Sequence, residues 1–110
     1  MISRYRWLGL SNYAGGMSTQ FLHEPDARRY VLRLDDELVA ILDYAINGSA
    51  VSFTRTFTTP AQRGKGFAAE IVQFAVDEVE RSGQLRIIPM CWYVGDWFDS
   101  HPERAGLLTR

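Results

Sequence analysis

Arg63-Gly64-Lys65-Gly66-Phe67-Ala68 is a glycine-rich turn that separates a run of β-forming segments from a long amphipathic helix. Glycine leaves the backbone N–H groups of such a turn uncovered, and the positive end of the helix dipole points toward whatever lies there. Arg63 and Lys65 add formal positive charge. The stretch therefore predicts a site for an anion such as phosphate, although the same residues also suit a plain, tight strand-to-helix connection.

Three strands are expected before the turn. Residues 30–34 and 51–57 alternate apolar and polar side chains, and residues 38–45 form an apolar run. Asp35-Asp36 and Asn47-Gly48 supply the two connections, and both Asn47 and Gly48 tolerate positive φ. Together these segments predict an antiparallel meander.

A helix and one further strand are expected after the turn. Apolar residues recur at a spacing of four over residues 67–79, and Ser82-Gly83 offers a left-handed cap, which together predict one long amphipathic helix. Residues 85–90 have the short apolar pattern of a buried strand. A short helix is expected over residues 95–100, and residues 103–108 would add one more turn. The predicted fold class is α/β (α+β), with a mixed, mostly antiparallel sheet.

Length and composition bound the class of protein. The chain has 110 residues, enough for one domain, and its 46% hydrophobic and 23% charged content is typical of a soluble globular protein. A net charge of −1 gives no reason to expect a nucleic-acid partner. No apolar run approaches the roughly 20 residues that span a bilayer. The single cysteine, Cys91, fits a reducing cytoplasm, and no metal site is expected.

Residues 1–26 differ from the rest of the chain. Residues 11–16 have turn-forming side chains and no sustained period, so we expect residues 1–26 to be a flexible N-terminal extension and residues 27–110 to form the domain. The first sixteen residues would be loosely attached, or an artefact of start-site choice, because Met17 could itself begin the chain. The alternative is that the apolar side chains of residues 5–8 dock on the body.

Two nucleotide-binding patterns can be set aside. Residues 64–69 formally fit G-x-G-x-x-A, but that fingerprint opens a parallel βαβ unit and is followed about 20 residues later by an acidic residue at a strand end. Here antiparallel strands come first, and the next strand ends in Pro89-Met90-Cys91. A P-loop is excluded because the chain has no G-x-x-x-x-G-K-[ST] sequence.

Four stretches together resemble a known family: residues 53–57, residues 60–68, residues 88–94 with Cys91 at the strand end, and His101-Pro102-Glu103. Their order resembles that of the GNAT superfamily of acyl-CoA-dependent N-acetyltransferases, and more specifically its small YjdJ-like N-acetyltransferase domain proteins. The resemblance runs from about Arg28 to Leu108.

Two residues depart from the pattern of this superfamily. Ala61 stands where the superfamily often has Gln or Arg, and Trp92 replaces the proline that commonly follows the cysteine in the small subfamily. The first departure matters little, because the main chain grips the anion. The second could reshape the acceptor side of the site.

The resemblance implies that the turn holds the pyrophosphate of coenzyme A and that the pantetheine arm lies beside the preceding strand. The implied coenzyme A-binding residues are Phe57, Thr58, Gln62, Arg63, Gly64, Lys65, Gly66, Phe67 and Ala68. This reading agrees with the anion site that the glycine-rich turn predicts on its own.

Cys91 and Tyr93 are the candidates for the acyl-transfer step. Cys91 ends the strand at the place where the thioester would arrive, so it would take the acyl group transiently or help to position the acceptor. The plain alternative is a buried cysteine that acts as a small apolar side chain. Tyr93 could protonate the departing thiolate, although an aromatic residue at a strand end is also common in a core. His101 is expected to cap or pack the short helix.

The sequence therefore predicts an acyltransferase that uses acetyl-CoA to acetylate an amine: a small amine, a polyamine or a protein lysine. Trp92, Tyr93, Trp97 and Phe98 would divide between packing the core and walling the acceptor pocket, where aromatic faces suit a cationic amine. The alternative, of a different class, is a coenzyme A-binding module without catalysis that serves as a sensor or interaction domain.

Overall fold

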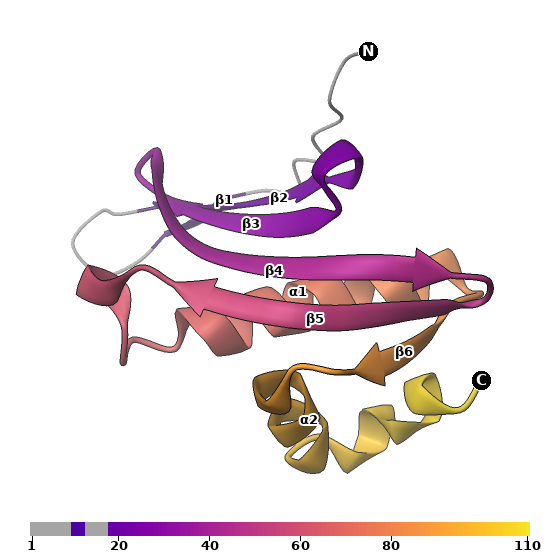
Figure 1. The fold of residues 1–110 in the computed structure, drawn as a ribbon. Coiled ribbons are helices and arrows are strands. Elements are labelled where there is room, and N and C mark those ends of the chain that lie inside the picture. Colours follow the sequence, from indigo (N-terminus) through magenta and orange to yellow (C-terminus); the bar gives the residue numbers. More distant parts are fainter. Residues whose placement is uncertain (1–9, 13–17) are drawn as a thin grey trace.

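The computed structural model describes residues 10–12 and 18–110, which form one sheet with a long helix against one of its faces (Figure 1). The elements follow in this order: β1 (Leu10–Asn12), β2 (Ser18–Glu24), η1 (Pro25–Ala27), β3 (Arg29–Leu34), β4 (Glu37–Asn47), β5 (Ala50–Thr58), η2 (Pro60–Gln62), α1 (Phe67–Ser82), β6 (Arg86–Pro89), α2 (Trp92–Asp99) and η3 (Pro102–Leu108). The η elements are 3₁₀ helices.

The sheet keeps the order of the sequence. In the described part of the chain it has six strands in the order β1-β2-β3-β4-β5-β6. Each neighbouring pair from β1 to β5 is antiparallel, and β6 runs parallel to β5. The predicted fold class and the predicted meander are confirmed, the meander being β3, β4 and β5.

Residues 18–24 belong to this sheet, although they fall within the predicted N-terminal extension. β2 pairs with β3 from Thr19↔Leu34 to Glu24↔Arg29, and the ring of Phe21 stacks on that of Phe74 in α1 at 5.0 Å. The sheet therefore starts before residue 26. Residues 10–12 of the predicted extension also join the sheet, as β1 beside β2. Its residues 1–9 and 13–17 lie outside the described residues.

The core lies between α1 and the sheet. Ile71, Val72, Ala75 and Val76 of α1 are fully buried and share one apolar cluster with the strand residues, among them Phe53. Burial of each large aliphatic side chain contributes roughly 1.5–3 kcal/mol, so this face holds the helix on the sheet. Gly83 ends the helix with φ of 84°, and its N–H donates to the Glu80 carbonyl. The predicted helix and its cap are confirmed.

The segment after β6 differs in one boundary from the prediction. Helix α2 begins at Trp92 rather than at residue 95, so Trp92 and Tyr93 lie in its first turn instead of extending a strand. Aromatic side chains have only modest helix propensity, so the sequence did not signal this start. The predicted final turn is confirmed as η3, where Arg104 bonds to Asp77 at 2.9 Å and to Glu80 at 2.7 Å on α1.

The described residues contain neither a candidate membrane span nor a candidate metal cluster. None of their helices is long and apolar enough to cross a membrane. Likewise, no three or more of their His, Cys, Asp and Glu side chains gather in a way that could hold a metal ion.

Candidate active site

The sheet opens between β5 and the segment that follows β6. β5 and β6 pair only from Ala50↔Arg86 to Phe53↔Pro89, and the last backbone–backbone hydrogen bond across the gap runs from the Cys91 N–H to the Phe53 carbonyl, at 3.0 Å. Beyond it β5 continues to Thr58, whereas the other chain segment turns into α2. The edge of β5 is therefore left without a neighbouring strand along its second half.

A β-bulge lies at the point where the opening starts. The register of β4 with β5 shifts between Asp43 and Tyr44, so that Thr54 is the extra residue between the pairs Asp43↔Arg55 and Tyr44↔Phe53. The Thr54 hydroxyl donates to the Asp43 carbonyl at 3.2 Å. Bulges bend a strand and increase its local twist. This bend helps to carry the second half of β5 away from the line of β6.

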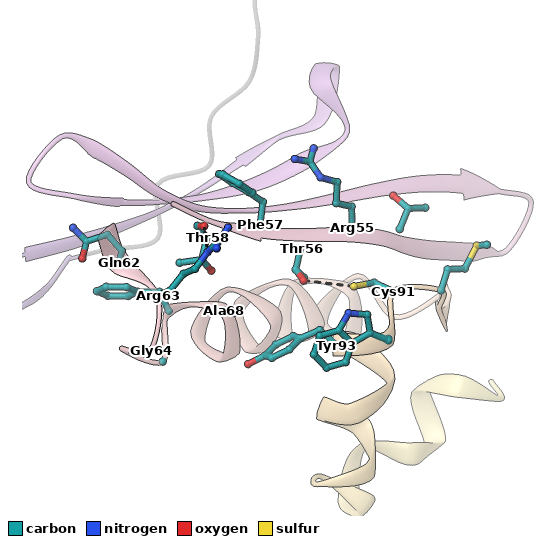
Figure 2. A pocket seen from close by; sticks show the side chains of 15 residues that line it. Arg55, Thr56, Phe57, Thr58, Gln62, Arg63, Gly64, Ala68, Cys91 and Tyr93 are labelled. Carbon is teal, nitrogen blue, oxygen red and sulfur yellow. Dashed lines mark hydrogen bonds between the residues drawn. The ribbon is translucent and has the colours of Figure 1, made fainter. Parts of the chain in front are cut away.

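A cavity of about 730 Å³ occupies the opening. Its size is in the usual range for sites that bind small molecules and cofactors. It is lined by residues 54–58 of β5, by Gln62, Arg63, Gly64, Gly66, Phe67 and Ala68 of the glycine-rich turn and the start of α1, and by residues 90–93. Figure 2 shows that Thr56 points from β5 toward Cys91, whereas Arg55 and Phe57 point from the other face of the strand.

The glycine-rich turn forms one end of the cavity. Gly64 and Gly66 have φ of 79° and 85°, in the left-handed region where other L-residues are strained. Gly66 is also the residue before the first turn of α1, so the free N–H groups of this 16-residue helix start at the cavity. The turn therefore presents uncovered backbone N–H groups to the cavity, as an anion site requires, and this backbone shape depends on glycine.

Of the two charged side chains of the turn, one lines the cavity and the other does not. Arg63 lines the cavity, and its Nε donates to the Thr58 carbonyl at 3.3 Å. Lys65 Nζ donates to the Gln62 side chain at 3.1 Å, and Lys65 does not line the cavity. Every other residue of the predicted coenzyme A site, and both candidate catalytic residues, line this one cavity.

Cys91 forms the other end of the cavity and is the residue immediately before α2. Its Sγ shares a hydrogen bond with the Thr56 hydroxyl at 3.5 Å (Figure 2). Burial alone would raise the pKa of the thiol, but the Thr56 hydroxyl and backbone hydrogen bonds from Tyr93, Val94 and Thr56 outweigh it, so the pKa is lowered. A cysteine at a helix N-terminus with a lowered pKa is a ready nucleophile.

The second candidate catalytic residue, Tyr93, has a phenol whose pKa is raised. It lines the same cavity from the first turn of α2. Burial, and to a lesser degree the negative charge of Asp96, raises the pKa of its phenol. The phenol therefore keeps its proton at neutral pH, which is the state that a general acid toward a leaving thiolate requires.

The aromatic residues after β6 divide as the sequence suggested. Trp97 and Phe98 are buried in the core, whereas Trp92 and Tyr93 line the cavity. His101 packs as expected: its ring stacks on Trp97 at 3.9 Å, and its Nδ1 donates to the Trp97 carbonyl at 2.7 Å. It does not line the cavity.

The sequence missed four lining residues, namely Thr54, Arg55, Thr56 and Met90. Thr56 is the most consequential, because it contacts the Cys91 sulfur. Its neighbour Phe57 was assigned to the site, so the position in sequence was close. Only the bulge and the start of α2 turn the Thr56 hydroxyl toward the sulfur, and neither has a clear signature in the sequence.

A family model described as GCN5-related N-acetyl-transferase matches residues 29–107, from β3 into η3. The chain belongs to this family of N-acetyltransferases, which confirms the predicted superfamily. The narrower likeness to YjdJ-like proteins stays a prediction. A search among curated protein sequences gives no significant match.

Proposed function

We propose that this protein is an acetyl-CoA-dependent N-acetyltransferase whose acceptor is an amine: a small amine, a polyamine or a protein lysine. The observation on which the proposal rests is the meeting of two features at one cavity. One is the glycine-rich turn at the start of α1, and the other is the Cys91 thiol at the start of α2. A cytoplasmic location goes with the proposal, because the thiol must stay reduced to act.

Coenzyme A would lie along the open half of β5, residues 54–58, which line the cavity. Backbone N–H groups of the turn from Gln62 to Ala68 would hold the pyrophosphate, with the charge of Arg63 and, from outside the cavity, of Lys65 adding to the α1 dipole. The pantetheine arm resembles a peptide and would follow the unpaired edge of β5 beside Phe57 and Thr58. That direction brings the thioester toward Cys91.

Two routes lead from the thioester to the amide. In the direct route a neutral amine attacks the acetyl carbonyl carbon, the C–N bond forms, the C–S bond breaks, and coenzyme A leaves as a thiolate. Tyr93 donates a proton to that thiolate and regains one from the amine through solvent. Here the site mainly orients the reactants and stabilises charge.

In the covalent route the Cys91 thiolate attacks first. The acetyl group moves to Sγ, coenzyme A leaves and takes up a proton, and the amine then attacks the new thioester to give the amide and restore the thiolate. The lowered pKa of Cys91 supports this route, because the thiolate is the nucleophilic form.

The test is to incubate the full chain with acetyl-CoA and a panel of amines, and to identify acetylated products by mass spectrometry. Product that depends on enzyme and on acetyl-CoA supports the proposal. Coenzyme A binding without product from any amine would instead favour the sensor or interaction module. Trapping an acetyl group on Cys91 without acceptor separates the covalent route from the direct one.

A further inference from the structure

The wall of the cavity next to Cys91 is unusually apolar for a surface. Among the described residues, the exposed large apolar side chains are Leu38, Ile46, Met90 and Trp92. The two most exposed are Met90 at 66% and Trp92 at 78%, and both line the cavity on either side of Cys91 in the sequence. Large apolar side chains exposed at the mouth of a binding cavity indicate a ligand that covers them.

The formal charges that line the cavity are all positive. Arg55 and Arg63 are its charged lining residues, and no Asp or Glu lines it. Asp43 pairs with Arg55 at 3.4 Å and Asp96 acts on Tyr93, but neither carboxylate belongs to the lining. A second cationic group on the acceptor would thus find no carboxylate in the lining to pair with. A desolvated charge without a partner disfavours such a ligand.

We propose that the acceptor is an amine joined to an aromatic ring or another large apolar group, with no second positive charge. This inference rests on the proposed function, because it names the acceptor class of the same site. The apolar group lies against Trp92 and Met90, and the amine nitrogen lies beside the thioester near Cys91. A small arylalkylamine and a single lysine next to an aromatic residue in a neutral peptide share this chemistry.

The first experiment compares kcat/KM for four acceptors with acetyl-CoA as donor, measured by mass spectrometry of the product. These are phenylethylamine, a neutral peptide with one lysine beside a phenylalanine, spermidine, and a peptide rich in lysine and arginine. At least one of the first two is expected to exceed both polycations by about tenfold or more, the discrimination that a shaped apolar pocket gives. The comparison between the first two distinguishes a small molecule from a peptide as source.

Variants then test the wall itself. Trp92→Ala is expected to lower kcat/KM for phenylethylamine about tenfold, and to weaken its binding to the coenzyme A-loaded protein in a calorimetric titration. Leu38→Ala, which truncates an exposed apolar side chain outside the cavity, is the matched control and leaves both values unchanged. Met90→Glu places a carboxylate on the wall, so it is expected to raise the relative kcat/KM for spermidine.

The outcomes separate this inference from the proposed function. Better turnover with spermidine or the basic peptide, or no effect of Trp92→Ala on rate and binding, overturns the acceptor class and leaves acetyl transfer standing. Coenzyme A binding with no acetylation of these four amines or of any amine in the wider panel overturns both.

Discussion

The two halves of β5 differ in burial, in strand pairing and in contact with the cavity, although they belong to one strand. Residues 50–53 are all buried and pair with β4 on one side and β6 on the other. Residues 54–58 are exposed or half-buried and line the cavity, and residues 55–58 pair only with β4. The bulge at Thr54 and the end of β6 divide them. One strand thus serves as scaffold and as binding edge, because its second neighbour leaves halfway.

The largest effect is expected in the scaffold half. Phe53→Ala removes a fully buried ring from the core and should lower the free energy of unfolding by about 3–5 kcal/mol, a large share of the stability of a small domain. Thr54→Ala, one residue further on and exposed, loses only the hydrogen bond to the Asp43 carbonyl and should lower it by about 0.5–1.5 kcal/mol. Urea unfolding of both variants measures the two free energies of unfolding. Equal losses of stability would contradict the division of β5 into a buried half and an open half.

Cys91→Ala tests whether the thiol beside the open half of β5 takes part in acetyl transfer. If the covalent route holds, acetyl transfer should fall on the order of a hundredfold, about 2.7 kcal/mol in activation free energy, while coenzyme A binds as before. Product formation measured at saturating acetyl-CoA, beside a binding titration, gives both numbers. Unchanged turnover would remove Cys91 from the chemistry and leave the direct route.

Gly66→Ala tests the turn at the far end of the open half. An alanine at φ of 85° should cost about 1–2 kcal/mol in backbone strain, and the altered turn should weaken coenzyme A binding. Gly106→Ala is the control, because Gly106 has no positive φ and open space around it. Comparable losses of coenzyme A affinity in the two variants would show that the turn is not the anion grip.

The smallest effect concerns the hydrogen bond between Thr56 and Cys91. Because the folded protein lowers the pKa of Cys91, alkylation by iodoacetamide should reach half its maximal rate at a lower pH than for a free cysteine, whose pKa is about 8.5. Thr56→Val removes the hydroxyl and should move that midpoint upward. Thr56→Ser should retain the wild-type profile, and a profile equal in all three proteins would exclude this bond as a cause.

Much of the fold could be predicted because its signals are local. The alternation in β3 and β5, the spacing-four pattern of α1 and the cap at Gly83 each follow from neighbouring residues. β2 was missed because the burial of Thr19 and Leu22 arises only after it pairs with β3.

In the candidate site, too, the residues with a local sequence signal could be predicted and those brought together by tertiary structure could not. The glycine-rich turn is one contiguous stretch, and a family resemblance extended it to Phe57 and Thr58. Thr56, in contrast, contacts Cys91 across 35 positions of sequence. That contact depends on a β-bulge and on the start of α2, and the sequence has no clear signal for either.

Every proposal above requires that the cavity along the open half of β5 binds coenzyme A. The direct measurement is the thermal unfolding midpoint of the full chain with acetyl-CoA, coenzyme A, NAD or ATP at equal concentration. At about 100 times its Kd a ligand adds about 2.7 kcal/mol to stability. We expect a clear rise with both coenzyme A forms, a smaller rise for Gly66→Ala, and little change with NAD or ATP. No rise with either coenzyme A form would contradict this expectation.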